Sequence, residues 1–76
     1  MYKYRIRLDT ISDIRGIVTI AELLPYEVRI ENTNGTKRGC AKTLFNVLDA
    51  ISYDKVYIVS DYDMYTKFVD YIIDET

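Results

Sequence analysis

The side chains best suited to chemistry are few in this chain, and they gather in two short segments. Asp13 and Arg15 lie near the start of a predicted helix, and Cys40 follows two cations, Lys37 and Arg38. A carboxylate or a guanidinium at a helix start can cap free N–H groups or help to hold an anion. A thiol beside cations is favoured as the reactive thiolate.

The residue types that are missing exclude most catalytic chemistry. The chain contains no histidine and a single cysteine. These counts exclude His-based acid–base catalysis, a Ser-His-Asp triad and an internal disulfide, and they argue strongly against a zinc site. A chain of 76 residues also has little volume for a deep cleft. We therefore expect no enzymatic activity, no cofactor and no metal site.

Composition indicates one folded domain spanning residues 1–76. Hydrophobic residues make up 49% of the chain and charged residues 29%, with a net charge of −2. This acidic balance disfavours nucleic-acid binding, which needs cations to neutralise phosphates. No apolar run approaches the ~18 residues of a membrane span, and no apolar signal stretch follows the N-terminus. These features predict a cytoplasmic protein without membrane contact.

The first half of the chain predicts two strands around a helix. Residues 2–8 alternate between apolar and charged side chains, which is the pattern of a half-buried strand. A 3–4 spacing of apolar residues predicts a helix over residues 14–24, with Ser12 or Asp13 as its cap and Pro25 as its end. Alternation resumes at residues 26–31 and predicts the second strand.

A hairpin and a second helix are expected next. Asn34-Gly35 favours a type I′ turn, followed by a short edge strand near residues 36–39. From Ala41 the period becomes helical. One face of this helix is predicted to consist of Leu44, Val47, Leu48 and Ile51.

The last third of the chain predicts a central strand and a closing helix. Residues 55–60 form the most apolar strand, and Asp61 is the expected cap of the last helix. The buried face of this helix is predicted to be Met64, Tyr65, Phe68, Val69, Ile72 and Ile73. The expected element order is β-α-β-β-α-β-α.

This element order resembles the phosphocarrier protein HPr of the sugar phosphotransferase system. Residues 55–75 are similar to the last strand and last helix of that family, and residues 40–59 match its second helix and following strand in length. The resemblance implies an α+β open-faced β-sandwich, with an antiparallel sheet in the order 1-4-2-3 and three helices on one face. An alternative with nearly the same element order is a ferredoxin-like fold with the sheet order 4-1-3-2 and a trailing helix.

The active loop of the HPr family is altered in this chain. The family loop is Gly-Ile-His-Ala-Arg-Pro, and the matching stretch here is Ser12-Asp13-Ile14-Arg15-Gly16. Arg15 falls on the family Arg, Asp13 on the phosphorylated His and Gly16 on the Pro. The resemblance therefore implies a domain that has lost the family's phosphorylatable residue.

The family's second site and docking patch also have counterparts. The resemblance places Cys40 at the position of a regulatory Ser that caps the second helix. Ile17, Ala41, Leu44 and Phe45 fall on segments through which the family contacts partners. Simpler roles are also open: Asp13 as a helix cap, and Cys40 as a small, partly buried apolar residue.

Charged residues also have structural roles open to them. We expect Arg15 to pair with Asp9 or Glu22 on the surface. On the sheet, we expect ion pairs between neighbouring strands. The residues concerned are Lys3, Arg5, Arg7 and Arg29 with Glu27 and Glu31.

The sequence thus predicts a non-phosphorylatable, HPr-like protein-interaction or regulatory domain related to the phosphotransferase system. Its partner would be a protein, such as a phosphotransferase-system enzyme or a regulator, and the domain itself would be a monomer or a weak dimer. Two alternatives remain: an atypical phosphocarrier using Asp13, or an unrelated small homodimeric domain of ferredoxin-like fold.

Overall fold

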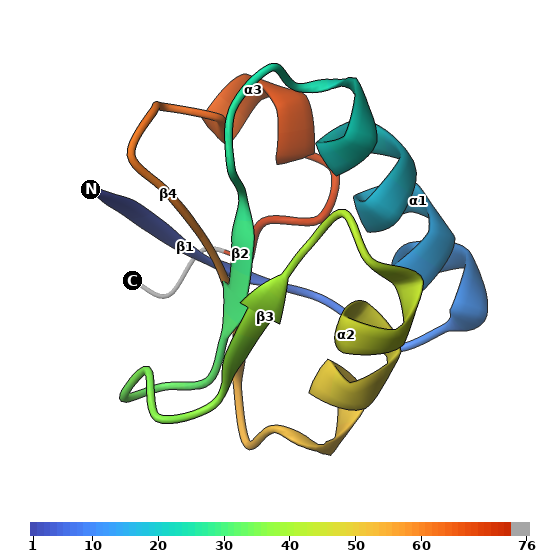
Figure 1. The fold of residues 1–76 in the computed structure, drawn as a ribbon. Coiled ribbons are helices and arrows are strands. Elements are labelled where there is room, and N and C mark those ends of the chain that lie inside the picture. Colours follow the sequence, from blue (N-terminus) through green and yellow to red (C-terminus); the bar gives the residue numbers. More distant parts are fainter. Residues whose placement is uncertain (74–76) are drawn as a thin grey trace.

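The fold is a four-stranded sheet covered on one side by helices (Figure 1). It was obtained as a computed structural model that describes residues 1–73. The strands are β1 (Tyr2–Ile6), β2 (Arg29–Glu31), β3 (Arg38–Cys40) and β4 (Val56–Ser60). The helices are α1 (Ile11–Leu23), α2 (Leu44–Asp49), a 3₁₀ turn η1 (Ala50–Ser52) and α3 (Tyr65–Phe68).

The strand order is β1-β4-β2-β3 with every pair antiparallel, as predicted. The most apolar strand, β4, lies between β1 and β2, with Tyr4 opposite Ile58 and Ile30 opposite Ile58. A ferredoxin-like sheet would instead pair the first strand with the third. The pairing of β2 with β4 therefore excludes that alternative.

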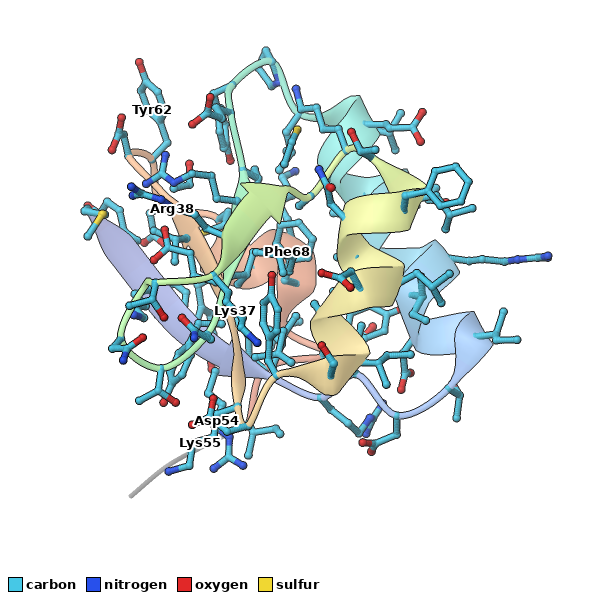
Figure 2. All side chains as sticks on the ribbon, turned by 60° about the horizontal axis from the view of Figure 1, so that its bottom comes forward. Lys37, Arg38, Asp54, Lys55, Tyr62 and Phe68 are labelled. Atoms are coloured by element: carbon cyan, nitrogen blue, oxygen red, sulfur yellow. The ribbon has the colours of Figure 1, made fainter. Side chains whose placement is uncertain are left out.

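One apolar core joins the sheet to the helices. Its fully buried members include Phe68 of α3, Ile17 of α1, Val47 of α2 and Ile58 of β4. Figure 2 shows Phe68 in the interior, whereas Tyr62 lies at the periphery. Burial of this apolar surface is the main favourable term holding the two layers together.

Helix α1 begins three residues earlier than predicted. Its N-cap is Thr10, rather than Ser12 or Asp13, because Thr10 and Asp13 form a reciprocal capping box. The helix ends at Leu23, and Leu24 adopts an extended conformation, as is favoured for a residue before proline. Pro25 thus ends the helix as expected.

The hairpin between β2 and β3 has a longer loop than predicted. Gly35 has a positive φ of 75°, but Asn34 does not, so the two residues do not form a type I′ turn. The Asn34 side chain instead accepts a hydrogen bond from the backbone N–H of Thr36 (3.2 Å). This side-chain bond replaces a tight backbone turn and leaves a loop over residues 32–37.

The last helix is much shorter than predicted. α3 ends at Phe68, and the chain then runs antiparallel along the free edge of β1. The Arg7 N–H donates to the Tyr71 carbonyl (2.7 Å), and the Ile73 N–H donates to the Arg5 carbonyl (2.8 Å). β-Branched Ile72 and Ile73 suit this extended path better than a helix. The part of the predicted helix over residues 74–75 lies outside the described residues.

Asp63, rather than Asp61, supports the start of α3. The Asp63 carboxylate accepts hydrogen bonds from the Tyr65 N–H (3.0 Å) and the Tyr4 hydroxyl (3.1 Å). The second bond ties α3 to β1. None of the helices within residues 1–73 is both long enough and apolar enough to cross a membrane.

Candidate functional site

The Asp13 carboxylate is occupied in holding the start of α1. One of its oxygens accepts hydrogen bonds from the backbone N–H groups of Asp9 (3.0 Å) and Thr10 (3.2 Å). The other lies 3.8 Å from the Arg7 guanidinium. These backbone hydrogen bonds, followed by the Arg7 charge, hold the pKa of Asp13 below its usual value. With 9% of its surface exposed, Asp13 has a structural role that explains its presence.

The other loop equivalents do not gather around Asp13. Arg15 is exposed, and among residues 1–73 it forms no ion pair with Asp9 or Glu22, contrary to expectation. Gly16 lies against Tyr71, whose hydroxyl oxygen would be 1.8 Å from an added Cβ. A larger residue here would displace that ring, so Gly16 has a packing role.

Cys40 does not cap the second helix. It is the last residue of β3, opposite Arg29 in the sheet register, whereas the N-cap of α2 is Thr43. The difference arises because the β2–β3 pairing continues past Cys40, with the Ala41 N–H donating to the Val28 carbonyl (2.8 Å). Cys40 is a half-buried free thiol on the sheet, and it is not adjacent to a helix start.

Two of the four predicted partner-binding residues are inaccessible. Ile17 and Ala41 are both 0% exposed and belong to the core, so a partner would not reach them. Leu44 and Phe45, in contrast, are 48% and 78% exposed. Phe45 is the most exposed aromatic side chain in the described chain.

Most of the apolar face predicted for this helix is exposed. Leu48 and Ile51, which the sequence placed on one face with Leu44 and Val47, are 46% and 49% exposed. Val47 and Ala50 point into the core instead, because only the side of this short helix that faces α1 and the sheet is covered. The regular spacing of Leu44, Leu48 and Ile51 signalled an apolar stripe, but periodicity does not say whether a stripe is covered. We call Leu44, Phe45, Leu48 and Ile51 the α2 surface.

A shallow hollow of about 520 Å³ lies on the α2 surface. It is lined by Phe45, Leu48, Asp49, Ile51 and Ser52. Asp49 is the one charged residue in this lining. The hollow is open to solvent, so it could receive a side chain from another molecule but could not enclose a small substrate.

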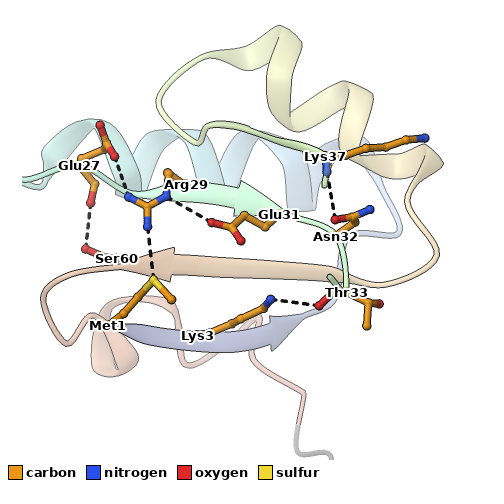
Figure 3. Close-up of polar contacts among 9 residues, drawn as sticks. All are labelled: Met1, Lys3, Glu27, Arg29, Glu31, Asn32, Thr33, Lys37 and Ser60. Atoms are coloured by element: carbon orange, nitrogen blue, oxygen red, sulfur yellow. Dashed lines mark hydrogen bonds and ion pairs between the residues drawn. The ribbon is translucent and has the colours of Figure 1, made fainter. Parts of the chain in front are cut away.

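The uncovered face of the sheet is polar and internally bonded (Figure 3). Arg29 donates to the carboxylates of Glu27 (2.7 Å) and Glu31 (3.3 Å), both on its own segment rather than on a neighbouring strand as expected. The Glu27 hydrogen bond, followed by that to Glu31, raises the pKa of Arg29 above its usual value despite partial desolvation. Lys3 donates to the Thr33 carbonyl (3.1 Å) and lies 4.8 Å from the centre of the Tyr57 ring.

Comparisons with protein-family models, with curated proteins and with solved structures find no match for this chain. In the described part of the chain, no group of three or more acidic or cysteine side chains is placed to hold a metal ion. The α2 surface is therefore the strongest candidate functional site, on the basis of its exposure and chemistry.

Proposed function

We propose that this chain is an HPr-like, non-phosphorylatable protein-interaction domain, related to the sugar phosphotransferase system, that docks a protein partner on the α2 surface. The observation that carries the proposal is the exposure of four large apolar side chains on α2 and η1, from 46% to 78%. Apolar patches of this kind on small soluble domains are typical of interaction sites.

The composition of the α2 surface fits docking by another protein. An exposed aromatic residue surrounded by aliphatic ones is the usual arrangement of an interface hot spot, where water is excluded around one anchor. Phe45 has this position, next to Leu48 in the lining of the hollow. The α+β fold with the sheet order 1-4-2-3 supports the HPr-like part of the proposal.

The bonding of Asp13 supports the loss of phosphotransfer. Two backbone N–H groups at the start of α1 donate to one oxygen of this carboxylate, and the other oxygen faces Arg7. A phosphoryl group on the second oxygen would turn the first into a neutral carbonyl, which accepts weaker hydrogen bonds than a carboxylate does. An atypical phosphocarrier using Asp13 is therefore the weaker alternative.

The experiment that tests docking is quantitative affinity capture from native lysate on the full chain. Phe45→Ala should lose most of the partner captured by the wild type, because it removes the central anchor of the interface. Tyr62→Ala is the matched control, because Tyr62 is also an aromatic residue and is 60% exposed, but it lies in the β4–α3 connection. Equal capture by all three proteins would contradict the proposal.

A separate measurement tests the alternative. The chain is incubated with phosphoenolpyruvate and the general donor enzyme of the phosphotransferase system, and its mass is recorded. We expect an unchanged mass. A gain of one phosphoryl group that disappears in Asp13→Asn would show that the chain is a phosphocarrier.

A further inference from the structure

Asp49 gives the apolar hollow a negative charge that the described chain leaves unpaired. It is the last residue of α2, it is exposed, and it lines the hollow beside Phe45 and Ile51. The ion pairs within residues 1–73 involve Arg7 and Arg29, and none includes Asp49. An unpaired carboxylate bordering an apolar surface is a ready contact for a cation.

The surroundings of Asp49 in its helix contain no neutralising charge. Helix α2 continues directly into η1, where the Ser52 hydroxyl donates to the Asp49 carbonyl (2.8 Å) and leaves the carboxylate free. The last turn of α2 contains no basic residue and ends on a carboxylate instead. The charge of Asp49 also contributes, after burial, to raising the pKa of the nearby Tyr53 hydroxyl. A cation brought by a partner would therefore meet the Asp49 carboxylate without competition from a cation of α2.

A second copy of this chain is a poor occupant of the hollow. A two-fold symmetric contact centred there would bring two Asp49 carboxylates together, and like charges across an interface are unfavourable. The cation at the other end of the helix, Lys42, is half-buried and donates to the Leu24 carbonyl (2.9 Å), so it is already engaged. The negative charge of Asp49 therefore favours another protein over a second copy of this chain as the occupant of the hollow.

We propose that the α2 surface receives an amphipathic segment of another protein, which places a large apolar side chain in the hollow and a Lys or Arg against Asp49. This inference rests on the proposed docking function and adds the chemistry of the partner. The apolar contact supplies most of the affinity. The charge pair at the rim selects basic over acidic partners.

The test is selection of displayed amphipathic helical peptides, with randomised flanking positions, on the full wild-type chain. Peptides that bind should carry Lys or Arg beside a large apolar residue. Binding of a selected peptide should weaken about threefold in Asp49→Asn, the effect typical of an exposed ion pair. It should weaken further in Asp49→Lys, which makes the contact repulsive. Because Asp49 is exposed, both variants should keep the thermal unfolding midpoint of the wild type.

Several outcomes would overturn this inference: no enrichment of peptides, enrichment without a basic bias, or unchanged affinity in Asp49→Lys. Light scattering that shows a wild-type dimer dissociated by Phe45→Ala would identify a second copy as the occupant and would also overturn it. Phe45→Ala separates the two proposals. If Phe45→Ala abolishes peptide binding while Asp49→Lys leaves the affinity unchanged, only the charge inference fails. If Phe45→Ala leaves peptide binding intact, the docking surface itself is wrong.

Discussion

The open face of the sheet and the outer face of the helix layer differ in whether their side chains find partners within the chain. On the open face of the sheet, the charged residues Lys3 and Arg29 find partners within the chain. On the outer face of the helix layer, Phe45 and its apolar neighbours on α2 contact mainly solvent. Lys3 and Arg29 are thus bonded within the chain, whereas the apolar side chains of the α2 surface are left partly uncovered.

The two faces also differ in whether long side chains shield their apolar residues from solvent. On the sheet, Val59 is 0% exposed although no helix lies above it, because it is paired with Lys3 on one side and Arg29 on the other. The long side chains of such residues bury their aliphatic parts while their charged ends stay bonded. The α2 surface has no equivalent cover. A charged face can therefore be structural, while the mainly apolar α2 surface is the one that we propose for docking.

The largest expected effect is the difference in stability between alanine substitutions at the two phenylalanines of the chain, Phe68 and Phe45. Phe68 is 0% exposed and Phe45 is 78% exposed. We expect Phe68→Ala to lower the free energy of unfolding by about 3–5 kcal/mol, through lost burial and a new cavity. Phe45→Ala should change it by less than about 0.5 kcal/mol. Urea unfolding followed by circular dichroism measures both values.

A large loss of stability in Phe45→Ala would contradict the comparison, since it would mean that α2 surface residues support the fold. Any loss of partner capture by Phe45→Ala would then be explained by partial unfolding rather than by loss of the docking contact. A stable Phe45→Ala protein is thus a condition for the docking test as well.

The next effect concerns the sheet face. Arg29→Met keeps most of the aliphatic length but leaves the carboxylate of Glu31, which is 6% exposed, without its hydrogen-bond donor. Hydrogen bonds to charged groups are worth about 1.5–3 kcal/mol, so we expect a loss of stability of about that size. Arg38→Met is the matched control, because Arg38 is exposed and forms no ion pair among the described residues. Partner capture should be unchanged in both variants. Reduced capture in either would indicate that the partner docks on the sheet face rather than on the α2 surface.

A smaller, pH-dependent effect is expected at the start of α1. Asp13 and Asp54 both have pKa values held below the ordinary value of 3.8, chiefly by backbone hydrogen bonds. A carboxyl group with a lowered folded-state pKa stabilises the fold above its unfolded pKa, and this contribution is lost as the pH falls through the folded value. Thermal unfolding of the wild type should therefore shift to lower temperature below about pH 4. Asp13→Asn should show a smaller acid shift, and an identical acid shift in both proteins would contradict the capping role.

The family resemblance implied the correct sheet order, while strand alternation and the hydrophobicity of residues 55–60 predicted the strands and the central place of the last one. The sequence pattern missed the first turn of α1, since the capping box of Thr10 and Asp13 lies before the apolar periodicity begins. It overextended α3, because Ile72 fits a helical face as well as it fits a bridge to Ile6. The capping box has a sequence signal of its own, a Thr three residues before an Asp, which lies outside the apolar periodicity. The segment after α3 is held by backbone hydrogen bonds to β1, which leave no mark on hydrophobic patterning.

The sequence predicted only part of the α2 surface, because hydrophobic patterning does not show which apolar side chains the fold covers. Leu44 and Phe45 were expected to contact a partner, whereas Leu48 and Ile51 were placed only on the apolar face of the helix. A helical stripe shows that one side is apolar, but what covers that side depends on the rest of the fold. Here Val47 and Ala50 occupy the inner side, which leaves the larger side chains outside.

The smallest expected effect on stability, and the sharpest test of the HPr resemblance, comes from Arg15. Its side chain is exposed and forms no ion pair within residues 1–73, so Arg15→Ala should change the free energy of unfolding by less than about 0.5 kcal/mol. Capture of the partner should weaken less than in Phe45→Ala, because a charge at the rim of an interface contributes less than a central apolar anchor. Glu22→Ala, another exposed charged position on α1, is the control. If Arg15→Ala and Glu22→Ala capture equally, the loop equivalents take no part in docking, and α2 alone contacts the partner.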